Sequence, residues 1–130
     1  MEAYKEAGHE YRYRDQLIVQ EFGLGMVAMG IVVSGIAKGS LTSLELGFVN
    51  SGVAVFTACL TLHLRNIHQD RMRAARIKRD LEQRLGLSGA HKNPTGIARL
   101  SAPLQMIRFM FLLSATWGLL ALKAFSQLIN

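Results

Sequence analysis

Two ionisable residues stand alone inside long apolar stretches of the sequence. Glu21 is the only ionisable residue between positions 17 and 37, and Arg108 is the only one between positions 104 and 122. A charged side chain costs about 2.5–3.5 kcal/mol at the centre of a bilayer, and an opposite charge beside it offsets part of that cost. We therefore predict that Glu21 and Arg108, each about one helical turn inside its apolar stretch, form an ion pair.

A third apolar stretch, over 44–64, is richer in hydrogen-bonding side chains than the other two. These side chains are Glu45, Asn50, Ser51, Thr57 and Thr61. They are typical either of hydrogen bonds between helices or of the lining of a pathway. As an alternative, a serine or threonine bonds to the carbonyl four residues earlier on its own helix, and Glu45 is a solvated residue at the membrane interface.

Arrangements of residues typical of enzymes and metal sites are missing from the sequence. His63 and His68 stand five residues apart, a spacing that places them on different faces of a helix. Cys59 is the single cysteine, so it has no disulfide partner in the chain and no metal-ligand spacing. We expect no catalytic activity, no metal and no cofactor.

The helices that position these residues are predicted over 17–37, 44–64 and 102–126. Each stretch is predominantly apolar, and about 20 residues of helix span the roughly 30 Å of a bilayer core. The helices of a soluble bundle would show a polar face, which none of the three does. A cleaved signal peptide is also disfavoured, because the preceding residues carry acids as well as bases. The predicted fold class is an all-α integral membrane protein with three transmembrane helices.

The second transmembrane helix is predicted to continue beyond the membrane as a long basic helix over 65–86. From position 53 to 85 the sequence has neither glycine nor proline, and Gly86 is a suitable terminator. Basic residues strongly outnumber acidic ones from Arg65 to Ser101, so this side is expected to be cytoplasmic. The remaining segments follow: a cytoplasmic amphipathic segment at 1–16, an extracytoplasmic turn at 38–43, a cytoplasmic loop at 87–101 and an extracytoplasmic tail at 127–130.

The basic helix offers two predicted contact surfaces. An apolar stripe is expected to pack against sister chains or a partner, because no other cytoplasmic segment looks long enough to cover it; it contains Ile77, Leu81 and Leu85. The alternative is that this stripe lies on the membrane surface. A set of arginines is expected to contact anionic lipid or an acidic partner: Arg71, Arg73, Arg76 and Arg79. Nucleic acid is not an expected partner, because no aromatic residue is interleaved with these bases.

Small residues four positions apart occur in all three predicted spans, where they let helix backbones approach closely. The residues we assign to packing between helices or copies are Gly30, Ser34, Gly47, Ser114 and Gly118. A three-helix monomer needs fewer such faces than this. We therefore expect at least one of them to meet another copy or another subunit.

Two functional hypotheses follow from these patterns. The first is a small self-assembling membrane protein, a homo-oligomeric pore, channel or membrane-perturbing effector whose basic helix serves assembly or partner sensing. The second is a non-catalytic accessory subunit of a larger membrane complex. In both cases the expected location is a bacterial inner (plasma) membrane, by analogy with small three-pass proteins as a class.

Overall fold

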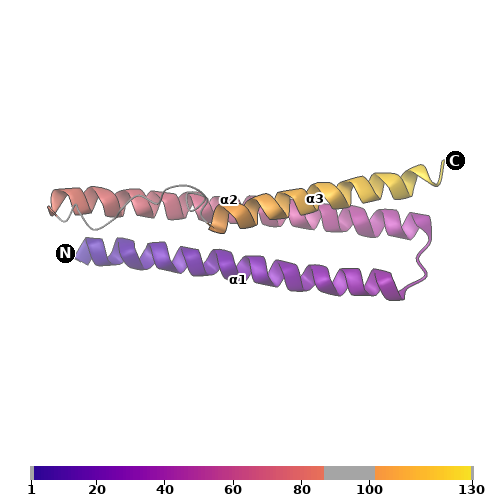
Figure 1. Cartoon of the computed structure of the whole chain (residues 1–130), viewed down its shortest axis with the longest axis horizontal. Coiled ribbons are helices and arrows are strands. Elements are labelled where there is room, and N and C mark those ends of the chain that lie inside the picture. Colours follow the sequence, from indigo (N-terminus) through magenta and orange to yellow (C-terminus); the bar gives the residue numbers. More distant parts are fainter. Residues whose placement is uncertain (1, 87–101, 130) are drawn as a thin grey trace.

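The computed structural model describes residues 2–86 and 102–129, and these residues form three long helices. Helix α1 spans Glu2–Lys38, α2 spans Ser43–Arg84 and α3 spans Ala102–Ser126. Figure 1 shows α2 running antiparallel to both α1 and α3, so that α1 and α3 point in the same direction. The predicted loop at 87–101 lies outside the described residues.

Helix α1 continues without a break from the polar N-terminal segment into the first apolar stretch. It has 37 residues, and its polar first half and apolar second half carry no proline. At 1.5 Å per residue it is about 55 Å long, well over the roughly 30 Å of a bilayer core. The N-terminal segment is therefore a helical extension of the first span.

Helix α2 also exceeds the thickness of a bilayer, as the sequence predicts. Its N-terminus is fixed by a capping box, in which Thr42 and Glu45 satisfy each other's backbone N–H groups. Its C-terminus is fixed by Gly86, whose φ of 69° is accessible to glycine at little cost. Its 42 residues span about 63 Å, about twice the roughly 30 Å of a bilayer core.

Helix α2 is central to the packing. It contacts α1 along one side and α3 along another, whereas α1 and α3 touch each other little. One core cluster joins Ile18 of α1 to Leu64 and Ile67 of α2 and to Met110 of α3. A second cluster centres on Trp117 of α3. Among the described residues, α3 lies along the first part of α2, and the second half of α2 packs against α1 (Figure 1).

Each of the three helices is long and apolar enough to cross a membrane. Large apolar side chains such as Leu24, Ile31 and Leu119 are exposed on the outside of the three-helix unit. A soluble chain would bury such residues, while lipid solvates them. The all-helical fold with three candidate membrane-spanning helices confirms that part of the predicted fold class and indicates an integral membrane protein.

Candidate functional site

Residues 65–84 of α2, which we call the α2 extension, are joined to the N-terminal half of α1 by an ion pair whose arginine is buried. Arg71 is only 8% exposed, and its Nε lies 2.9 Å from Oδ1 of Asp15. The Arg71 guanidinium also donates a hydrogen bond to the hydroxyl of Tyr11 and lies 4.5 Å from the centre of that ring. Arg71 is therefore not free to contact lipid or an acidic partner, and its predicted role is corrected to a link between α1 and α2.

Further polar contacts join α1 to the α2 extension. Arg14 of α1 donates to Asp70 of α2 at 3.1 Å. Near the end of α2, the Tyr4 hydroxyl donates to Glu82 at 3.0 Å, and this hydrogen bond raises the pKa of Tyr4 above its usual value. The expectation that no other segment covers the α2 extension is therefore wrong, because the first residues of α1 are helical and lie along it.

The apolar stripe of the extension is divided by this packing. Ile67 and Ala74, which lie on the same face of α2 as the predicted stripe, are buried, and Leu81 is half-buried. Ile77 and Leu85 remain 56% and 48% exposed. The three residues predicted to form one assembly surface are thus not equivalent, and the open part of that surface is at Ile77 and Leu85.

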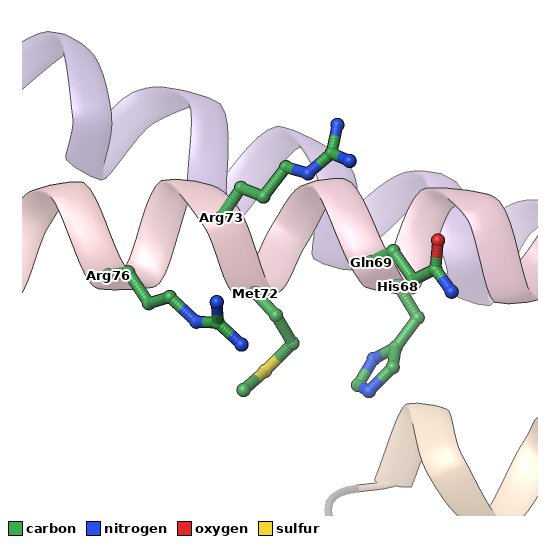
Figure 2. A pocket seen from close by; sticks show the side chains of 5 residues that line it. All are labelled: His68, Gln69, Met72, Arg73 and Arg76. Atoms are coloured by element: carbon green, nitrogen blue, oxygen red, sulfur yellow. The ribbon is translucent and has the colours of Figure 1, made fainter.

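A basic pocket of about 350 Å³ lies on the α2 extension and is lined by His68, Gln69, Met72, Arg73 and Arg76. Figure 2 shows His68, Met72 and Arg76 projecting to the same side of α2. Burial lowers the pKa of His68, the charge of Arg71 lowers it further, and Asp15 acts in the opposite direction. The neutral form of His68 is therefore favoured in this site.

The exposed arginines of the extension differ in their partners. Arg73 lies 3.4 Å from Asp70 in a solvent-exposed pair. Arg76 and Arg79 are exposed and form no ion pair within the part of the chain that the structure describes. The pairs Lys78–Glu82 and Asp80–Arg84 are present at the helical spacing seen in the sequence. Arg73, Arg76 and Arg79 therefore stay available for the predicted contact with lipid or an acidic partner.

The hydroxyl groups inside the second span bond to their own helix. Ser51 donates to the carbonyl of Gly47, Thr57 to that of Val53, and Thr61 to that of Thr57, at 2.7–2.8 Å. Thr57 and Thr61 are also buried between helices. This is the alternative in which serine and threonine satisfy themselves four residues back, and it leaves these hydroxyls little capacity to line a pathway.

Asn50 differs from these hydroxyls because its side-chain amide has no hydrogen-bond partner among the described residues. It is 3% exposed, and no hydrogen bond reaches its amide from residues 2–86 or 102–129. It lines a cavity of about 280 Å³ whose other walls are apolar and include Val33 of α1 and Trp117 of α3. Among the polar residues predicted in this span, Asn50 alone faces a cavity with hydrogen-bonding capacity to spare.

The predicted pair between Glu21 and Arg108 is not formed. The neighbouring rings of Phe22 and Phe109 meet edge to face with their centres 6.2 Å apart, so the two charges do lie at the same depth. However, Glu21 and Arg108 each precede the contacting phenylalanine by one residue, which turns the side-chain direction by about 100° around the helix axis. Because α1 and α3 run in the same direction, this turn has the same sense in both helices. Because the two helices face each other, this rotation carries Glu21 and Arg108 to opposite sides of the contact, and no ion pair joins them.

Glu45 has a local structural role. Its carboxylate accepts hydrogen bonds from the backbone N–H of Thr42 at 2.9 Å and from the Thr42 hydroxyl at 2.8 Å. It is the acidic member of the capping box that begins α2. The sequence T-S-L-E matches the capping-box pattern. Capping is therefore a simpler explanation of Glu45 than a role in lining a pathway.

Only some of the predicted small residues lie in the contacts between the three helices. A Cβ atom added to Gly47 would lie 2.7 Å from the Phe125 ring, and Ser114 donates to the Ala54 carbonyl at 3.0 Å, so these residues hold α3 against α2. Gly118 is half-buried with open space around it. Gly30 and Ser34 are exposed on α1, and nothing lies within 4 Å of a Cβ added to Gly30.

Sequence reasoning missed several residues that connect the helices. Gly25 is one, because a Cβ there would lie 2.3 Å from a methyl carbon of Leu60. Tyr11 and Asp15 are others, and the helical spacing of Tyr4, Tyr11 and Asp15 on one face of α1 is the signal that could have identified them. No family model, no curated protein and no solved structure matches this chain.

Proposed function

We propose that this chain is a small self-assembling integral membrane protein, a homo-oligomeric pore, channel or membrane-perturbing effector. The observation that carries the proposal is the open apolar surface on the α2 extension, beyond the span. Ile77 and Leu85 are exposed there even though the first residues of α1 pack along the same extension. Outside the membrane no lipid solvates these side chains, so association with another chain is the way to remove them from water.

A second open surface lies within the first span. Gly30 and Ser34 are four residues apart on α1, and both face away from α2 and α3. Small residues at this spacing allow a second helix to approach closely in lipid. Two surfaces on one protomer, one inside the span and one beyond it, are what a continuous contact between copies requires.

The polar residues of α2 do not support a pathway through one protomer. Thr57 and Thr61 are buried and bonded to their own backbone. A pathway in this proposal lies between copies, and its formation depends on closure of the ring that the copies make. The exposed Arg73, Arg76 and Arg79 lie on the same extension and serve contact with anionic headgroups or an acidic partner.

The alternative is a non-catalytic accessory subunit, in which a different chain covers the same surfaces. Both proposals use Ile77 and Leu85, but only self-assembly produces a multiple of the 14.4 kDa chain when the protein is purified alone. The mass of the purified protein in mild detergent or nanodiscs therefore separates them.

The test changes Ile77→Asp together with Leu85→Asp and measures the mass by native mass spectrometry. Carboxylates buried in an apolar seam without partners are strongly disfavoured, so the variant should insert normally but fall to a single chain. The control, Gln69→Asp with Gln83→Asp, adds the same charge at exposed positions of the same helix and should keep the wild-type mass. An unchanged mass in the first variant would remove the main support for self-assembly through the extension.

A further inference from the structure

A groove of about 460 Å³ lies between α2 and α3. Its lining includes two arginines, Arg65 of α2 and Arg108 of α3. Its apolar wall contains the buried Ile107 and three further side chains, Leu62, Phe111 and Leu112. These three side chains are exposed on the outer surface of the protein.

Both arginines lack an anionic partner. Neither takes part in an ion pair or a hydrogen bond with residues 2–86 or 102–129, and both are exposed. The only other polar residue of the groove, Thr61, has its hydroxyl bonded to the Thr57 carbonyl. The groove therefore has two free guanidinium groups, which prefer phosphate or carboxylate oxygens.

The two ends of the groove lie at different depths along the spans. Arg65 is the first charged residue after the apolar stretch of α2, and Arg108 lies two turns inside the start of α3. Because α2 and α3 are antiparallel, Leu62 on one helix and Phe111 and Leu112 on the other lie on the same side of the arginines, toward the middle of the spans. The groove is thus basic at the membrane interface and apolar toward the membrane interior.

We propose that this groove binds an anionic phospholipid, with the headgroup phosphate between Arg65 and Arg108 and an acyl chain along Leu62, Phe111 and Leu112. Positive charge at an interfacial groove favours an anionic headgroup, and guanidinium groups bind phosphate through two parallel hydrogen bonds. The adjoining apolar wall favours a lipid over a free anion, because it contributes contact area that only an acyl chain uses. This site is separate from the arginines of the α2 extension and does not depend on the proposed assembly.

The test measures retention of dioleoyl phosphatidylglycerol by native mass spectrometry on the purified full-length protein. The variants are Arg65→Gln and Arg108→Gln, and the control is Arg12→Gln, an exposed arginine of α1 that does not line the groove. Each groove variant should weaken binding about fivefold, as expected for the loss of one interfacial arginine. The control should bind as the wild type does. Dioleoyl phosphatidylcholine should bind more weakly than phosphatidylglycerol to both the wild type and the control, and this difference should be smaller in the groove variants.

Two further arms identify the source of the phosphate. Inorganic phosphate in large excess should leave phosphatidylglycerol bound, whereas displacement by phosphate would show a simple anion site and overturn the proposal. Equal retention in the groove variants and the control would also overturn it. A lower oligomer mass in Arg108→Gln, with lipid retention unchanged, would show instead that an acidic residue of a second copy occupies the groove.

Discussion

Removal of the Asp15 carboxylate should release the N-terminal half of α1 from α2. In Asp15→Asn the Arg71 guanidinium keeps its buried position but loses its anionic partner, which lies 2.9 Å away in the wild type. Breaking a fully buried pair in this way costs about 3–5 kcal/mol. The Asp15 side chain is 44% exposed, so solvent screening reduces this to about 1–2 kcal/mol. The packing of the two helices should weaken by that amount.

Hydrogen exchange measures this opening directly. A loss of about 1–2 kcal/mol makes the opened state roughly 5- to 30-fold more populated, and amides of the first 16 residues should exchange faster by that factor. The double change Asp15→Asn with Arg71→Met should exchange more slowly than Asp15→Asn alone, because no charge is then left without a partner in the contact. Glu10→Gln is the control, since it removes only an exposed pair within α1. Equal exchange rates in Asp15→Asn and Glu10→Gln would refute the assignment of Arg71 as a buried link.

Three further predictions address packing, pH and topology. Gly47→Ala should destabilise the contact of α3 with α2 by about 1–3 kcal/mol through overpacking, whereas Gly52→Ala, which meets open space on the same helix, should be neutral or stabilising in thermal unfolding. Because the pKa of His68 is lower in the folded state than its usual value of 6.5, its contribution to stability is present above about pH 6.5 and lost as the pH falls below it. His68→Gln should therefore flatten the fall in melting temperature between about pH 7.5 and pH 5.5, and an equally steep fall would contradict this. In a cysteine-free background, Arg79→Cys should react with an impermeant reagent only from the cytoplasmic side and Gln127→Cys only from the other; labelling of both from one side would contradict three spans.

The helices themselves could be predicted from the sequence because strong local signals define them. Apolar stretches of about 20 residues predict the spans, and the run of helix formers up to Gly86 predicts the continuous α2. The capping signal at Thr42 and Glu45 is also local. The face on which a side chain lies and the residues it contacts could not be predicted in this way, since they depend on how the helices are rotated against one another.

Glu21 and Arg108 show why contacts between side chains were harder to predict than the helices. Matching depth in the membrane follows from the sequence, and the contact between Phe22 and Phe109 agrees with it. The direction of each side chain around its helix depends on the parallel arrangement of α1 and α3, which composition does not give. The burial of Arg71 was missed for a related reason, because its partners lie more than 50 residues earlier in the chain.

The mass of the wild-type protein, purified alone and released from lipid nanodiscs into a native mass spectrometer, tests self-assembly most directly. The account predicts one dominant species at a fixed multiple of the 14.4 kDa chain, with the multiple unchanged over a range of protein-to-lipid ratios. A dominant species of a single chain at every ratio would contradict it.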